Sequence, residues 1–101
     1  MNIVFWGTPE YSVPTLNQLF QSKHKIVAVV TQPDKRRKRG KALYPSPIKE
    51  RARELGLKVL TPINIKNDII TTKELFELNA DVYIVVAFGQ ILPLEILEHP
   101  A

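Results

Sequence analysis

The hydrophobic residues of the chain gather in four short runs, separated by longer stretches of mixed character. The runs lie at residues 3–6, 26–31, 58–60 and 82–88. In the second and fourth runs nearly every residue is apolar, without the alternation of a strand that has one face in water. We therefore predict four strands, of which the second and fourth are covered on both faces.

Amphipathic stretches between these runs predict helices. Apolar residues at helical spacing follow Ser12, a residue type that caps helix N-termini, and a second helix opens at residues 46–47 and ends at Gly56. A third stretch contains Thr71–Glu74, whose Thr-to-Glu spacing is that of a capping box. We expect three complete helices and the start of a fourth at Pro93.

Alternation of strands with helix-length connections is typical of α/β folds, in which right-handed crossovers join parallel strands. We predict a three-layer α/β structure whose parallel sheet has the order 3-2-1-4, so that the first and fourth strands are neighbours. Ligands of such sheets bind outside the carboxyl ends of the strands, where the strand order reverses. The loops at residues 7–10 and 89–93 should line that crevice.

A chain of 101 residues with 45% hydrophobic residues corresponds to one domain with a modest core. The absence of Cys excludes disulfides, a thiolate nucleophile and Cys-based metal centres, and the two His residues lack ligand spacing. No apolar run reaches the roughly 18 residues that span a bilayer, and the N-terminus resembles neither a signal nor a transit peptide. We expect a soluble, cytoplasmic protein without a metal.

Positive charge is concentrated in one segment. The chain has 14 Lys and Arg against 10 Asp and Glu, and six of the 14 lie within seven residues. Without them, eight basic and ten acidic residues would give a net charge of −2. Such a cluster suits a polyanion, nucleic acid above all, with a solvated charged loop as the alternative. We predict a mobile loop that becomes ordered on binding, made of Lys35, Arg36, Arg37, Lys38, Arg39, Gly40 and Lys41.

Sequence motifs for phosphate binding and for nucleophilic catalysis are absent. The turn after the first strand contains a single glycine, Gly7, which either serves a tight turn or lies beside a ligand. Residues 86–93 also allow two interpretations. They form a strand end and a helix start with Ile91 and Leu92 in the core, or they form the wall of a pocket for a flat apolar ring. Both interpretations stay open on these residues alone.

Five short segments are distinctive when they are taken together. They are Ile3–Glu10, Thr31–Lys35, Arg39–Lys41, Ser46–Lys49 and Ala87–Pro93. In order and spacing they resemble the methionyl-tRNA formyltransferase family over the whole chain. The resemblance implies that residues 1–101 are the N-terminal portion of a formyltransferase catalytic domain with a Rossmann-like fold.

This resemblance implies formyl transfer from 10-formyltetrahydrofolate to the amino group of methionyl initiator tRNA, in translation initiation. Related enzymes hold the pterin ring of the folate with the segment that matches residues 90–92. The cofactor is therefore predicted to contact Phe88, Gly89, Gln90, Ile91 and Leu92.

The family insertion that matches residues 34–49 grips the acceptor end of the tRNA, and Arg39 matches its most critical cation. Residues that match Arg36–Lys38 are often neutral in the family, so this chain is more basic there, which we expect to raise its affinity for phosphates. The tRNA is predicted to contact the basic segment together with Gly7, Thr8 and Pro9.

The resemblance also implies that the 101-residue chain is inactive by itself. The catalytic Asn, His and Asp of the family match positions beyond Ala101, and His99 does not match the catalytic His. The complete protein is expected to be a monomeric folate-dependent formyltransferase. The alternatives are a formyltransferase for a small amine, which would not need six extra cations, and a non-enzymatic RNA-binding α/β module.

Overall fold

The computed structural model of the protein describes residues 1–36 and 42–99. Its main sheet has four strands, and every neighbouring pair is parallel. In spatial order they are β5 (Val59–Leu60), β2 (Lys25–Val30), β1 (Asn2–Gly7) and β6 (Val82–Val86). Numbered among themselves, these strands have the order 3-2-1-4, which confirms the predicted sheet.

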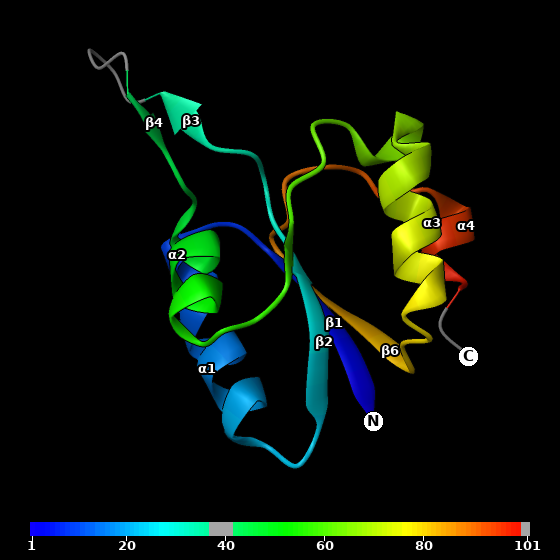
Figure 1. Cartoon of the computed structure of the whole chain (residues 1–101), viewed down its shortest axis with the longest axis horizontal. Coiled ribbons are helices and arrows are strands. Elements are labelled where there is room, and N and C mark those ends of the chain that lie inside the picture. The colour runs from blue at the N-terminus through cyan, green and yellow to red at the C-terminus, as the bar shows by residue number, and fades with distance from the viewer. Residues whose placement is uncertain (37–41, 100–101) are drawn as a thin grey trace.

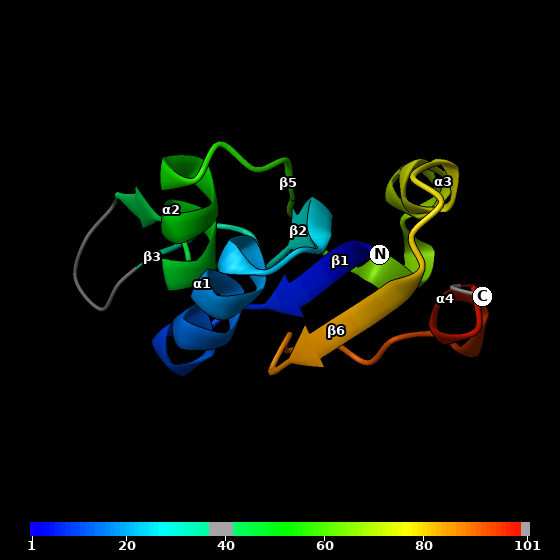
Figure 2. The same ribbon diagram turned by 90° about the horizontal axis from the view of Figure 1, so that it is seen from below.

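Helices cover the sheet on both faces and complete three layers. α1 (Val13–Gln21) and α2 (Pro47–Glu54) lie on one side, and α3 (Ile69–Glu77) and α4 (Leu94–Leu97) lie on the other (Figure 2). Two 3-10 turns, Glu10–Ser12 and Ile65–Asn67, precede α1 and α3. Within the described residues, no helix is long and apolar enough to cross a membrane.

The central strand β1 supplies both hydrophobic cores, because successive side chains of a strand point to opposite faces. Val4 and Trp6 pack with Leu75 on the side of α3 and α4. Phe5 packs with Leu16 and Ile48 on the side of α1 and α2. The run at 3–6 is apolar without alternation because β1 is buried on both faces.

The start of the third helix differs from the prediction. The proposed capping box at Thr71–Glu74 is wrong, because the N-cap of α3 is Asp68, three residues before Thr71, and the helix begins at Ile69. The Asp68 carboxylate caps the helix, accepting from the Thr71 backbone N–H at 2.9 Å and from the Thr71 hydroxyl at 2.8 Å. A carboxylate at a helix N-terminus also interacts favourably with the helix dipole. The cap predicted at Ser46 is confirmed, since its hydroxyl accepts from the Lys49 N–H at 3.0 Å.

The fourth predicted strand is shorter and more exposed than its apolar run indicates. β6 ends at Val86, and Ala87 has a φ of 54°, a left-handed conformation that cannot continue a strand. The prediction that this strand is covered on both faces is wrong, because β6 lies at the edge of the sheet and Val85 is 45% exposed. The same prediction is confirmed for most of β2, where Ala28–Val30 are buried.

Part of the predicted basic loop is a β-hairpin. β3 (Lys35–Arg36) pairs antiparallel with β4 (Leu43–Tyr44), and the hairpin extends away from the carboxyl ends of the main strands (Figure 1). Lys35 and Arg36, predicted as part of a mobile loop that becomes ordered on binding, thus have strand partners in Tyr44 and Leu43. Arg37, Lys38, Arg39, Gly40 and Lys41 lie outside the described residues.

Candidate functional site

A side chain that follows β1 ties the carboxyl ends of β1 and β6 together. The Thr8 hydroxyl donates to the Phe88 carbonyl over 2.7 Å. Gly7, just before it, has no room for a side chain, because an added Cβ would lie 2.8 Å from a ring carbon of Phe5 and 3.0 Å from the Val86 carbonyl oxygen. Its tight packing accounts for the glycine at this turn.

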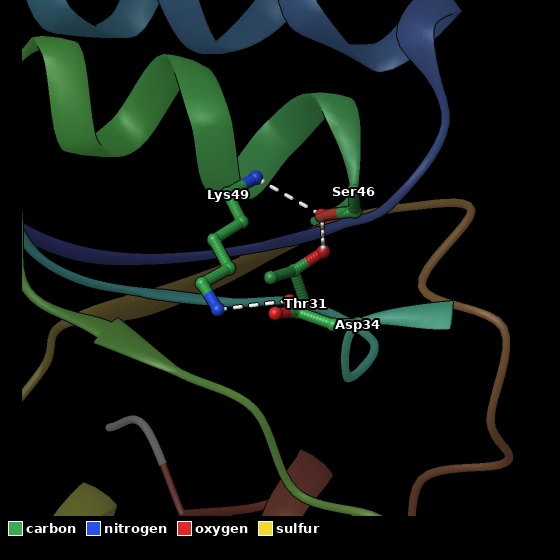
Figure 3. A network of polar contacts seen from close by, with 4 residues as sticks. All are labelled: Thr31, Asp34, Ser46 and Lys49. Carbon is green, nitrogen blue, oxygen red and sulfur yellow. Dashed lines mark hydrogen bonds and ion pairs between the residues drawn. The ribbon is translucent and has the colours of Figure 1, made fainter. Parts of the chain in front are cut away.

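Three hydroxyl groups from separate segments of the protein are linked by hydrogen bonds at this edge of the sheet. Ser46 Oγ and Thr31 Oγ1 are 2.6 Å apart, in the network that Figure 3 shows. Thr31 Oγ1 donates to Thr8 Oγ1 at 3.4 Å. Thr31 and Ser46 are buried, so these contacts lock the end of β2 to the start of α2.

The donor and acceptor in each of these hydrogen bonds follow from counting protons, since each hydroxyl group has only one to donate. Thr8 gives its proton to Phe88 and accepts from Thr31 and from the Gln32 backbone N–H at 3.3 Å. Thr31 gives its proton to Thr8, so Ser46 must donate to Thr31. The Thr8 oxygen is then saturated, and the Ser46 oxygen keeps one free acceptor position.

An ion pair joins the base of the hairpin to α2. Lys49 Nζ lies 2.8 Å from Asp34 Oδ1, and Asp34 directly precedes β3 (Figure 3). Both side chains are between a fifth and a third exposed, at 23% and 30%, so solvent weakens the attraction. The pair contributes mainly to the direction in which the hairpin leaves the sheet.

Gln90 cross-links three segments through its side-chain amide. Its Oε1 accepts from the Ile65 backbone N–H at 2.8 Å. Its Nε2 donates to Gln32 Oε1 at 2.8 Å and to the carbonyls of Pro62 and Ile63 at 3.0 and 3.1 Å. This one side chain holds the loops after β2, β5 and β6 together, so its binding capacity is used within the protein.

We expect Gln90→Leu to lower the free energy of unfolding by about 1–3 kcal/mol, because the Ile65 N–H and two carbonyls would lose their partner. The control is Gln90→Glu, which keeps an acceptor for Ile65 but no donor when it is ionised. Its carboxylate would face carbonyl oxygens, which raises its pKa above the ordinary value of about 4.3. The stability of this variant should be greatest below pH ~4 and fall as pH rises through the raised pKa. Chemical denaturation at several pH values measures both effects, and wild-type stability of Gln90→Leu would contradict the cross-link.

A cavity of about 270 Å³ opens between this edge of the sheet and the base of the hairpin. Its lining comes from the turn after β1, the loop after β2, the start of β3 and the connection from β4 into α2. The lining residues are Thr8, Gln32, Pro33, Lys35, Tyr44, Pro45, Ser46 and Pro47. Of these, only Thr8 and Lys35 were predicted as site residues, because the others come together only where the base of the hairpin meets the loops after β1 and β2.

The sequence model of the family described as Formyl transferase matches residues 1–101. The chain belongs to the formyl transferase family. It is similar to curated proteins named "Methionyl-tRNA formyltransferase", with 60% identity in Synechococcus sp. (strain WH7803) and 62% in Synechococcus sp. (strain CC9902). The relative from Prochlorococcus marinus (strain MIT 9312) is 51% identical. Each alignment covers 99% of this chain, which spans only 29–30% of the length of these relatives.

In this formyl transferase chain, the five residues predicted to bind the cofactor have different surroundings. Phe88 is 2% exposed and packs edge-on against Trp6, with ring centroids 5.1 Å apart, so its side chain belongs to the core. Leu92 packs beside the same core. Ile91 is 91% exposed, and Gly89 is exposed with a φ of 98°. The Ile91 side chain and the Gly89 backbone are therefore the groups that this segment offers to a ligand.

The residues predicted to contact tRNA are likewise divided between structural and exposed positions. Gly7 is buried, and the Pro9 carbonyl accepts from the Ser12 hydroxyl at 2.6 Å within the 3-10 turn. Thr8 lines the cavity, but its hydroxyl is saturated. Lys35 is exposed, lines the same cavity and begins the basic segment.

Among the described residues, no group of three or more His, Cys, Asp or Glu side chains could hold a metal ion. The edge of the sheet instead offers hydroxyl, amide and ammonium groups, which suit hydrogen bonding to a polar ligand.

Proposed function

We propose that residues 1–101 are the N-terminal portion of the catalytic domain of a methionyl-tRNA formyltransferase. The complete protein would transfer a formyl group from 10-formyltetrahydrofolate to the amino group of methionyl initiator tRNA. The observation that carries this proposal is the 50–62% identity, over 99% of the chain, to relatives with that name. The cavity beside the carboxyl ends of β1 and β2 supports it, because α/β folds bind ligands at this edge of the sheet.

The reaction would be an acyl transfer. The free amine attacks the formyl carbon, a C–N bond forms, and a tetrahedral oxyanion results. When the intermediate collapses, the bond from the carbon to N10 of the folate breaks, the amine loses a proton and N10 gains one. Hydrogen-bond donors that face the oxyanion would stabilise it, and the resemblance to the family assigns the catalytic Asn, His and Asp to positions outside residues 1–101.

The role of this chain would be to bind and position both substrates. At the end of β6, the exposed Ile91 side chain and the Gly89 backbone would contact the pterin ring. Gln90 would act indirectly, because its amide holds the three loops beside that position.

The basic segment would bind the tRNA on the other side of the edge. Lys35 lies in the hairpin that extends beyond the sheet (Figure 1). The cations that follow Lys35 in the sequence would reach phosphates of the acceptor end, while the ion pair between Lys49 and Asp34 anchors the hairpin.

The complete protein, incubated with 10-formyltetrahydrofolate, should formylate methionyl initiator tRNA and leave free methionine unmodified. The physical reason is that binding energy from the RNA, remote from the amine, is available to position the reacting atoms. Incorporation of labelled formyl groups into each acceptor measures this selectivity. A nucleotide-linked amino sugar serves as the competing small amine, and preferential formylation of that sugar would show that the enzyme acts on a small amine.

A further inference from the structure

The cavity beside the hairpin is distinct from the segment assigned to the pterin ring, because residues 88–92 do not line it. Its apolar walls come from three prolines and the ring of Tyr44, and its polar groups come from Gln32, Lys35 and Ser46. A flat ring fits between rigid apolar walls, while the polar groups can contact the edge of the ring. The cavity thus has the composition of a small-ligand site.

Most of the polar groups of this cavity that are free to bind a ligand are hydrogen-bond donors. Gln32 uses its Oε1 to accept from Gln90, and its Nε2 has no acceptor among the residues that the structure describes. Lys35 has no acidic partner in the described ranges 1–36 and 42–99. With the Thr8 oxygen saturated, Ser46 retains the one free acceptor position identified above for the linked hydroxyl groups. The site therefore favours a ligand that is rich in acceptors and negatively charged.

Size and charge together narrow the ligand class. A volume of about 270 Å³ is just below the 300–1,000 Å³ of sites for drug-sized ligands, so it suits one nucleoside and is too small for a complete folate. The methionyl end of a charged tRNA carries an amine, which Lys35 would repel when that amine is protonated. A nucleotide combines a flat ring, acceptors on the edge of its base and a phosphate.

We infer that this cavity binds one nucleotide of the tRNA, with the base between the proline walls and Tyr44 and its edge accepting from Gln32 Nε2. The phosphate of that nucleotide would contact Lys35. The inference rests on the proposed function and deepens it, because Lys35 belongs both to the cavity and to the basic segment. Stacking of a base on an aromatic ring and contact with a cation are the usual means of binding unpaired RNA.

The direct test is a titration of the complete, isotope-labelled protein with nucleoside 5′-monophosphates, followed by NMR. We expect saturable shifts of the backbone amides of Thr8, Gln32, Tyr44 and Ser46, with a Kd on the order of 1 mM, as befits one isolated unit of a larger ligand. Ribose 5-phosphate and inorganic phosphate are the control ligands and should shift these amides at least tenfold more weakly.

Two substitutions separate binding from structure. Gln32→Glu keeps an acceptor for Gln90 but removes the two donors, so it should weaken the binding of monophosphates at least tenfold without unfolding the protein. Lys35→Gln should weaken monophosphates and leave uncharged nucleosides unchanged. Its matched control is Lys66→Gln, at a lysine outside this cavity, which should have no effect.

The inference is overturned if monophosphates leave these four amides unshifted at 10 mM, on the order of ten times the expected Kd, or if inorganic phosphate shifts them equally. Initiator tRNA is titrated in parallel. Binding of tRNA without a response to monophosphates would refute the nucleotide site alone. Failure of the tRNA itself to bind would refute the RNA-binding part of the proposed function, and the inference with it.

Discussion

Replacing the six cations of residues 35–41 with Ser should reduce the salt dependence of initiator-tRNA binding by roughly 3 to 4 log units of affinity per decade of salt. This holds if about four of them contact phosphates, because each contact releases ~0.9 counterion on duplex DNA. Within the set, Arg39→Ala alone should cost about 1–3 kcal/mol of binding free energy if its guanidinium makes a bidentate contact, and less if it contacts one phosphate. Salt titrations of the complete protein, intact and substituted, measure both quantities.

Folding should be almost unaffected by the same substitutions. The segment contributes six charges and no apolar residue, and surface changes usually alter stability by less than about 0.5 kcal/mol. A melting curve of each variant is therefore the control for the binding data. Equal affinity and equal salt slopes for the intact and substituted proteins would mean that the segment is solvated charge, and the RNA-binding part of the proposal would have to be abandoned.

The 101-residue chain by itself should transfer no formyl group to methionyl initiator tRNA, whereas the complete protein should do so. The sheet edge in this chain offers positioning groups, but the family resemblance assigns the groups that move protons and stabilise the oxyanion to positions beyond it. Residues that act as a unit are strongly non-additive, so loss of one member of a catalytic set already removes about as much activity as loss of the whole set. Assays with equal molar amounts of the two proteins, and the same 10-formyltetrahydrofolate, give the comparison.

Folding of the short chain must be checked in that experiment, since an unfolded chain would also be inactive. Circular dichroism and the dispersion of NMR signals provide the check. Turnover by the folded 101-residue chain would contradict the assignment of catalysis to residues outside it, and would point instead to the polar groups at the ends of β1 and β2.

Much of the architecture was predictable because it depends on local pattern. Continuous apolar runs separated by helix-length stretches left few arrangements besides a parallel sheet with right-handed crossovers. The order that β5, β2, β1 and β6 adopt is a common one in doubly wound sheets. The end of α2 and its Ser46 cap followed from residue types alone. The start of α3 did not, because Thr71 and Asp68 both suit a helix N-terminus, and only the folded chain shows that the Asp68 carboxylate takes the cap.

Which side chains form the site depended on contacts between residues that are far apart in the sequence. Sequence by itself identified the basic segment, the turn at Gly7 and the segment at the end of β6, since charge clusters and turn residues are local features. It could not reveal that Thr8, Thr31 and Ser46 share hydrogen bonds, or that Gln90 reaches Gln32 across 58 positions. Periodicity tells which face of an element a side chain lies on, but crossovers and the hairpin decide which side chains meet. The tertiary structure alone therefore created the cavity and placed Gln32 in its lining.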